Sequence, residues 1–83
     1  MPDERPQPNH DYRRIFGVRL ARLRREKQWS QERLALESGL ARSYLSGVER
    51  GKRNIALMNI CRLAEVLELA PWKLLDFDDS AGR

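Results

Sequence analysis

Apolar residues recur along most of this chain with the 3.6-residue period of an α-helix. The first stripe has members separated by four, four and three positions: Tyr12, Phe16, Leu20 and Leu23. This spacing puts them on one face of a helix that ends near Lys27. No segment alternates apolar and polar residues with the two-residue period of a strand. The pattern therefore predicts an all-α fold.

Two short helices are predicted next, one between Ser30 and Gly39 and one over residues 42–50. Ser30 offers a side-chain oxygen as N-cap of the earlier helix. Gly39 and Gly51 are expected to end the two helices, because glycine readily adopts the left-handed conformation of a tight turn. The side chains expected to face the core are those of Leu34, Ala35, Leu45 and Val48.

The rest of the chain carries one more long stripe and one short helix. The stripe, from about residue 57, consists of Leu57, Ile60, Leu63, Ala64 and Leu67. Pro71 is expected at the first position of a short last helix, where its missing N–H is not needed. We therefore predict a compact five-helix bundle over residues 12–77. The polar stretches 1–11 and 78–83 are predicted to be a flexible N-terminal tail and a frayed C-terminal tail.

Basic residues concentrate in the middle of the chain. Residues 12–55 carry twelve basic and four acidic side chains, whereas all other residues carry four basic and eight acidic ones. This asymmetry is typical of a surface that attracts a polyanion, although solvated helix faces also produce a basic segment. An 83-residue chain leaves room for one domain with a thin core, for which well-formed helices or self-association would compensate.

Candidate chemistry other than binding is sparse. Cys61 is the single cysteine, so no disulfide is expected and a reducing, cytoplasmic location fits best. The only histidine, His10, lies in the predicted tail, and Asp78 and Asp79 are adjacent in a terminus. We expect no enzyme, no metal site and no cofactor. No apolar run is long enough for a membrane helix or a signal peptide, so no membrane partner is expected.

The stretch from Ser30 to Gly51 has the form of a helix-turn-helix, with two short helices joined by a few residues that include a glycine. Leu45 and Val48 would hold the third predicted helix against the core. Its outer face would then present small and basic residues to a DNA major groove, which is roughly 12 Å wide. These residues are Arg42, Ser43, Ser46 and Gly47.

At these residues the chain resembles the helix-turn-helix regulators of the lambda-repressor and Cro type, also called xenobiotic-response-element type. The matching runs are Trp29-Ser-Gln-Glu-Arg-Leu-Ala35, Ser38-Gly-Leu40, Arg42-Ser-Tyr-Leu-Ser-Gly-Val-Glu-Arg-Gly-Lys-Arg-Asn54 and Ile60-Cys-Arg-Leu-Ala-Glu-Val-Leu67. The resemblance covers about residues 12–75. The run from Arg42 to Arg50 is similar to restriction–modification controller proteins in particular. The resemblance implies a sequence-specific regulator that binds double-stranded DNA with its recognition helix, about residues 42–50, in the major groove.

The resemblance also implies individual roles. Gln31 would bond a phosphate at the start of the second helix, unless it is only a solvated first-turn residue. Arg42 and Ser43 would face base edges, although Arg42 has the alternative of touching phosphate alone. Tyr44 would follow on the groove side, unless its ring packs on the second helix. Gly47 would read no base itself but would let the helix or a neighbouring arginine approach closely. The loop after the recognition helix would contact the DNA backbone and sometimes a base, through Arg50, Lys52, Arg53 and Asn54.

Two charged residues are expected to be structural. In this family an arginine late in the first helix pairs with a glutamate near the end of the recognition helix, and the matching residues are Arg24 and Glu49. The resemblance implies a partly buried, bidentate pair that orients the recognition helix.

The fourth and fifth predicted helices depart from the family pattern. Ala56 stands where a capping serine or threonine is usual, Glu68 replaces a glycine and Ala70 replaces a capping serine. Four residues there would form an exposed apolar surface: Met58, Cys61, Trp72 and Leu75. We interpret this surface as a homodimer interface, which would favour a roughly palindromic operator. The alternative is that these residues complete a small core.

One other class of function remains open. Helix-turn-helix folds also serve as protein-interaction modules, and an antitoxin would combine DNA binding with a protein partner. The basic groove face favours DNA over a purely protein-binding role.

Overall fold

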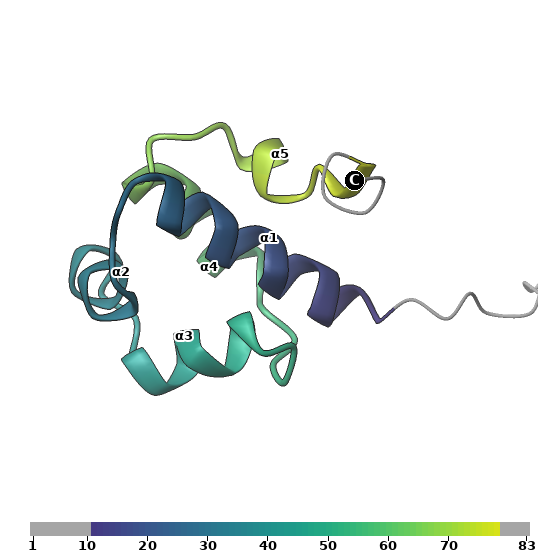
Figure 1. The fold of residues 1–83 in the computed structure, drawn as a ribbon, viewed down its shortest axis with the longest axis horizontal. Helices are drawn as coiled ribbons and strands as arrows, with labels where there is room; N and C mark the ends of the chain where they lie inside the picture. Colours follow the sequence, from purple (N-terminus) through teal and green to yellow (C-terminus); the bar gives the residue numbers. More distant parts are fainter. Residues whose placement is uncertain (1–10, 79–83) are drawn as a thin grey trace, which may run out of the picture.

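The computed structural model describes residues 11–78, which contain five α-helices and no strand (Figure 1). The helices are α1 (Tyr12–Glu26), α2 (Gln31–Ser38), α3 (Arg42–Glu49), α4 (Leu57–Val66) and α5 (Pro71–Leu74). The predicted all-α fold with five helices is therefore confirmed. Apart from Asp11 and Asp78, the two predicted tails lie outside the described residues. No helix within residues 11–78 is long and apolar enough to cross a membrane.

The helices begin and end where side-chain chemistry favours it. The Ser30 hydroxyl accepts a hydrogen bond from the backbone N–H of Arg33 at 2.9 Å, which confirms its role as N-cap of α2. Asp11 caps α1 in the same way through the N–H of Arg13 at 3.1 Å. Gly39 and Gly51 follow α2 and α3 with φ of 77°, the left-handed conformation that was predicted for them.

The long helix α1 separates two parts of the molecule. In Figure 1, α3 lies on one side of α1 and α5 lies on the other. Side chains pack between α1 and α3, α2 and α3, α2 and α4, α4 and α5, and α1 and α5. The buried core consists of Phe16, Leu20, Leu23, Leu34, Leu45, Val48, Ile60, Leu63, Ala64, Leu67 and Leu74. Of the core positions predicted in the helix-turn-helix, Leu34, Leu45 and Val48 are buried, and Ala35 is half-buried against the core.

Two residues of the predicted stripes are exposed instead of buried. Leu57 is 69% exposed, because side chains in a helix lean toward its N-terminus and the first residue of α4 therefore points past the core. Tyr12, the first residue of α1, is 54% exposed and stacks on Phe77 with ring centroids 5.8 Å apart. In both helices the apolar stripe begins one turn later than the spacing predicts.

Helices α4 and α5 are held by few local interactions. Neither Ala56 nor Ala70 makes a side-chain cap hydrogen bond, and Glu68 adopts a φ of 60° where a glycine is usual. Helix α5 is positioned by Leu74, which is buried in the core, and by Arg19 of α1, which is 3% exposed and whose Nε donates to the carbonyl oxygen of Lys73 at 2.9 Å. The sequence analysis gave no role to Arg19.

Candidate nucleic-acid interface

Helices α2 and α3 form the helix-turn-helix, joined by Gly39, Leu40 and Ala41. The C-terminal end of α3 also lies very close to α1. A Cβ added to Gly17 of α1 would lie 2.4 Å from the carbonyl oxygen of Val48 and 2.5 Å from that of Glu49. A glycine is therefore required at this crossing, although glycine within a helix is unfavourable. The sequence analysis did not single out Gly17, although a glycine inside an otherwise regular helix is a sign that another backbone passes close to it.

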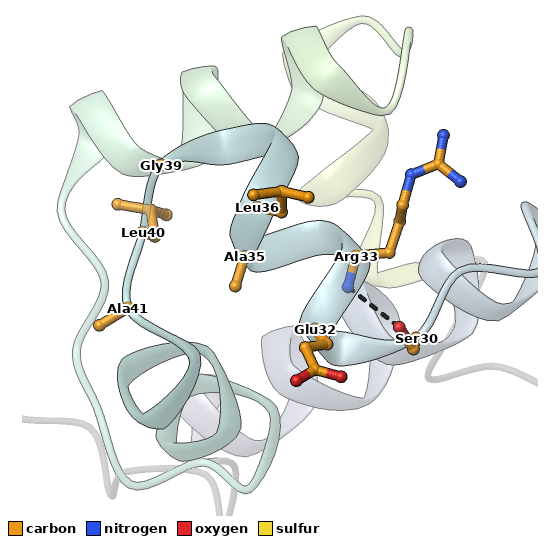
Figure 2. A pocket seen from close by; sticks show the side chains of 8 residues that line it. All are labelled: Ser30, Glu32, Arg33, Ala35, Leu36, Gly39, Leu40 and Ala41. Atoms are coloured by element: carbon orange, nitrogen blue, oxygen red, sulfur yellow. Dashed lines mark hydrogen bonds between the residues drawn. The ribbon is translucent and has the colours of Figure 1, made fainter.

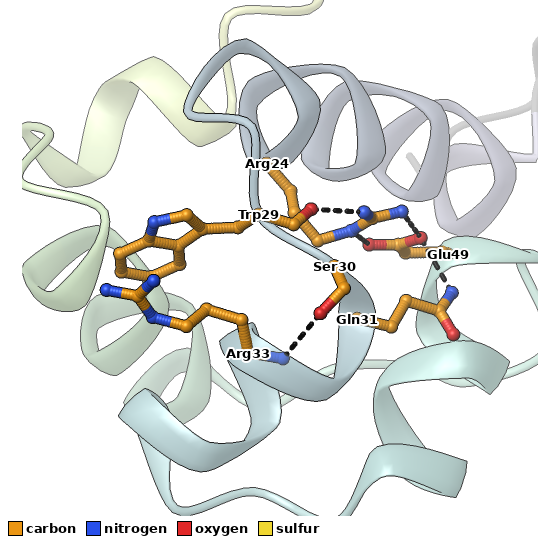
Figure 3. A network of polar contacts seen from close by, with 6 residues as sticks. All are labelled: Arg24, Trp29, Ser30, Gln31, Arg33 and Glu49. Atoms are coloured by element: carbon orange, nitrogen blue, oxygen red, sulfur yellow. Dashed lines mark hydrogen bonds and ion pairs between the residues drawn. The ribbon is translucent and has the colours of Figure 1, made fainter.

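A polar network joins α1, α2 and α3 (Figure 3). Arg24 donates from Nε to Oε2 of Glu49 at 2.7 Å and from Nη2 to Oε1 at 2.9 Å. Its third nitrogen, Nη1, donates to the carbonyl oxygen of Trp29 at 2.7 Å. The Gln31 amide donates from Nε2 to Oε1 of Glu49 at 2.9 Å. The network thus fixes both ends of the helix-turn-helix to α1.

The network is mostly shielded from water. The Arg24 and Glu49 side chains are 10% and 5% exposed. Hydrogen bonds that Arg24 donates to Glu49 raise the pKa of Arg24 above its usual value, so the guanidinium stays charged at neutral pH. A bidentate arginine–carboxylate pair fixes orientation as well as distance. The direction of α3 relative to α1 therefore depends on this pair.

The N-terminal half of α3 presents polar side chains to solvent. Arg42 and Ser43 are exposed, and Ser46, one turn later, is half-buried. Past the helix end, Arg50 is exposed and its Nε donates to the carbonyl oxygen of Ser46 at 3.3 Å. The exposed basic loop continues with Lys52, Arg53 and Asn54. The structure thus places most of the predicted DNA-contacting residues on one helix and its following loop.

Tyr44 and Gly47 differ from the rest of this surface because both are covered. Tyr44 is half-buried, and its hydroxyl accepts a hydrogen bond from Nδ2 of Asn59 in α4 at 3.1 Å. Gly47 is buried beneath the side chain of Arg53. Asn59 was missed by the sequence analysis, because its position opposite Tyr44 depends on how α4 packs.

The path of the loop after α3 is set by backbone hydrogen bonds. The N–H of Gly51 donates to the carbonyl of Val48 at 3.0 Å, and the N–H of Lys52 donates to that of Gly47 at 2.8 Å. This pair of bonds is the Schellman motif, in which a left-handed residue reverses the chain over the last helical turn. The loop is consequently ordered next to α3, with Arg53 directly after the motif.

A shallow hollow lies on the outer side of α2 and beside the turn to α3 (Figure 2). Leu36, which is 79% exposed, and Leu40 line it together with small side chains. Its polar lining side chains are those of Ser30, Glu32 and Arg33. None of the described residues forms a cluster of three or more His, Cys, Asp or Glu side chains able to hold a metal.

The C-terminal helices expose a different kind of surface. Leu57, Met58, Trp72 and Leu75 are exposed large apolar residues and Cys61 is exposed as well; we call these five residues together the apolar patch. Met58 is 76%, Trp72 61% and Leu75 46% exposed, so these side chains do not complete a core within the described chain. Leu57 was not among the predicted members of this surface.

Comparison with known proteins identifies the family to which this helix-turn-helix belongs. A model of the family HTH_3, described as helix-turn-helix, matches residues 20–71. The chain belongs to the HTH_3 helix-turn-helix family. The match begins within α1 and ends at the start of α5, so it includes the whole network around Glu49. The predicted resemblance to this class of regulator is confirmed.

Solved structures and individual relatives show which kinds of HTH_3 protein this chain is similar to. The restriction–modification controller protein C.AhdI from Aeromonas hydrophila is 51% identical, with a TM-score of 0.76 over 78% of this chain and 98% of that chain. The regulator SinR in complex with DNA is 35% identical, with a TM-score of 0.70 over 74% of this chain and 98% of that chain. A hypothetical transcription factor from Neisseria meningitidis is 43% identical over 75 residues, and the match covers 90% of this chain and 66% of that protein. The predicted similarity to controller proteins is therefore also confirmed for this HTH_3 chain.

Proposed function

We propose that this HTH_3 protein is a transcription regulator that binds a specific sequence of double-stranded DNA through α3. The observation that carries the proposal is the exposed pair Arg42 and Ser43 on a helix whose direction is fixed by the Arg24–Glu49 pair. Exposed basic residues in the following loop add attraction for phosphates. The SinR–DNA complex and the controller C.AhdI, both similar to this chain, support the same function. These relatives are regulators, and we propose no catalytic role.

The proposed contacts follow from side-chain chemistry. Arg42 would donate two parallel hydrogen bonds to O6 and N7 of a guanine, which is worth roughly 1–3 kcal/mol of discrimination. Gln31 uses one amide hydrogen on Glu49, and the second hydrogen of that NH2 group would bond a phosphate. Ser43 and Ser46 would complete the groove contacts. Arg50, Lys52 and Asn54 would bond the backbone of the same half-site.

The test of this function is selection from random duplex DNA, with binding followed by fluorescence anisotropy over a salt series. We expect enrichment of an inverted repeat whose half-sites lie one helical turn, roughly 34 Å, apart. Affinity should fall steeply with salt, because bound phosphates release counterions. Enrichment of no sequence would contradict the proposal, even if the protein still bound DNA at low salt.

Arg42→Ala sharpens this test. We expect the variant to lose preference at one position of the half-site while its circular dichroism melt stays the same, since Arg42 is exposed. The matched control is Arg22→Ala. Arg22 is exposed and lies about 200° around α1 from the buried Arg24, away from α3. An Arg42→Ala protein that selects the wild-type operator would remove Arg42 from the base-reading residues.

We further propose that the protein is a homodimer joined through the apolar patch. On so small a domain, a cluster of exposed large apolar side chains marks an association surface. The patch residues lie on α4, on α5 and directly after α5, whereas the proposed base-reading residues lie on α3, so a two-fold pair could present both recognition helices to one face of DNA. A palindromic operator would follow from that symmetry.

Sedimentation at micromolar concentration tests the dimer. We expect wild type to sediment as a dimer and Met58→Glu as a monomer, because a buried unpaired charge is unfavourable. Leu36→Glu is the control, since Leu36 is equally exposed but lies on α2, outside the patch. A wild-type monomer would contradict the proposal.

A second candidate is a protein partner, as in an antitoxin. The observation that favours it is the hollow lined by Leu36, which is 79% exposed, and by the half-buried Leu40. Failure to bind any duplex at low salt would favour this candidate over DNA binding. A cytoplasmic location stays a prediction from the sequence.

A further inference from the structure

Gly47 leaves a gap in the middle of the recognition helix, and Arg53 fills it. A Cβ added to Gly47 would lie 2.9 Å from Cγ, 3.4 Å from Nε and 3.7 Å from Cδ of Arg53. The stem of Arg53 therefore runs along the surface of α3 where any larger residue at position 47 would place its own side chain. This contact is possible because the Schellman turn at Gly51 reverses the chain just before Arg53.

The far end of Arg53 is also held. Its guanidinium lies over the ring of Tyr44, with Cζ 5.9 Å from the ring centroid. Tyr44 precedes Gly47 by three residues, so the two share one face of α3. The Tyr44 ring is itself anchored, because its hydroxyl accepts the hydrogen bond from Asn59 of α4. Arg53 thus rests on Gly47 and Tyr44, while its side chain remains exposed to solvent.

We propose that Arg53 is a specificity-determining residue that reads base edges, and that Gly47 is the positioning residue that allows it to do so. The proposal rests on the proposed DNA-binding function and adds one residue to its base-reading set. An arginine held along the recognition helix has its donors fixed relative to α3, and such donors match acceptor atoms on base edges. A loop arginine that swings freely would contact phosphates instead.

The glycine itself supports this assignment. Glycine within a helix is less stable than alanine at the same place. At Gly47 the added methyl group would meet only a movable side chain, whereas at Gly17 it would meet backbone carbonyls. Gly47 is therefore not required by the packing of the helices. Its effect falls on the position of Arg53.

The experiment compares wild type, Gly47→Ala, Arg53→Ala, Arg53→Lys and the double variant Gly47→Ala/Arg53→Ala by selection from random duplex DNA. Affinity for the wild-type operator is measured by anisotropy. We expect Gly47→Ala and Arg53→Ala to relax preference at the same base position and to weaken operator binding roughly tenfold. The double variant should bind no worse than either single variant, because Gly47 acts only through Arg53.

Stability and charge provide the controls. We expect the Tm of Gly47→Ala to equal the wild-type value or exceed it by up to about 6 °C, since alanine favours the helix. A weakened operator affinity then cannot come from misfolding. Arg53→Lys keeps the charge but lacks the planar fork, so it should lose the base preference and keep the salt dependence. Lys52→Ala should weaken binding to all sequences alike.

Three results would overturn the proposal. Gly47→Ala could select the wild-type operator with wild-type affinity, Arg53→Ala could weaken all sequences equally, or the two losses could multiply in the double variant. If wild type itself enriches no sequence, the proposed function fails and this proposal fails with it. If wild type enriches an operator that the variants also select, only this proposal fails.

Discussion

The helix-turn-helix of α2 and α3 and the C-terminal pair α4 and α5 share one core but differ in their polar contacts and in the surfaces that they expose. The first is fixed by directional polar contacts, above all the two hydrogen bonds between Arg24 and Glu49. The second has no side-chain caps, contains Glu68 at a positive φ, and exposes large apolar side chains. Directional contacts suit a surface that must align with base edges, whereas apolar contacts suit a surface that is covered by another protein chain.

This difference predicts which substitutions destabilise the helix-turn-helix half (α2 and α3) and which destabilise the C-terminal half (α4 and α5). The largest effect is expected for Arg24→Ala, which leaves the Glu49 carboxylate buried without its cation and also removes the bond to the Trp29 carbonyl. Breaking a buried pair in this way costs about 3–5 kcal/mol of folding free energy. That is a large part of the stability of a small domain. DNA binding should be lost through misfolding.

Thermal and urea melts followed by circular dichroism measure this loss. The matched control is Arg25→Ala, which removes the same side chain from the adjacent, exposed position. It should change the free energy of unfolding by no more than about 0.5 kcal/mol. A wild-type melting midpoint for Arg24→Ala would show that the pair does not hold the helix-turn-helix.

A smaller and more local effect is expected for Arg19→Met. The substitution keeps the apolar stem but removes the Nε donor from the carbonyl of Lys73, a hydrogen bond from a charged group worth about 1.5–3 kcal/mol. Because this bond ties α5 to α1, hydrogen exchange should accelerate at the amides of α5 before those of α3. The dimer should also weaken, since Trp72 and Leu75 lie on or directly after α5.

Val18→Met is the control for this variant. Val18 is 61% exposed on the same helix, so the new methionine should leave exchange and association unchanged. Equal loss of protection in α3 and α5 for Arg19→Met would show that the two halves unfold as one unit, and the distinction between them would fail.

The order of the helices was predictable because caps, glycines and the 3.6-residue period all mark their limits in the sequence. Ser30 caps α2 with its hydroxyl, and Gly39 and Gly51 adopt the left-handed conformation that the absence of a Cβ allows. The pairing of Arg24 with Glu49 came from the family resemblance, since residues 25 positions apart carry no periodic signal. The exposure of Leu57 was not predicted, because periodicity gives a face of a helix but not where the core ends.

Contacts that depend on the path of the chain could also not be predicted from the sequence. A sequence gives Arg19 as one of several arginines on a basic helix, and charged residues are usually exposed. Its burial follows from α5 folding back across α1. Arg53 was expected in a basic loop, but its place over Gly47 depends on the turn at Gly51. In both cases tertiary packing determines which of several arginines makes the contact.

The smallest expected effects come from the helix N-termini, and they have opposite signs in the two halves. Ser30→Ala removes the hydroxyl that accepts the Arg33 N–H and should lower the free energy of unfolding by about 1 kcal/mol. Ala56→Ser should raise it by a similar amount, because Ala56 already has the extended backbone of an N-cap and its position is exposed. Urea melts of both variants and of their combination measure the two changes, which should add to nearly zero because the sites share no partner. If Ala56→Ser fails to stabilise the protein, the start of α4 is held by contacts other than a cap.

The proposed dimer interface begins at that same turn with Leu57 and Met58. Repeating the melts on the Met58→Glu variant would therefore show whether those contacts come from a second chain.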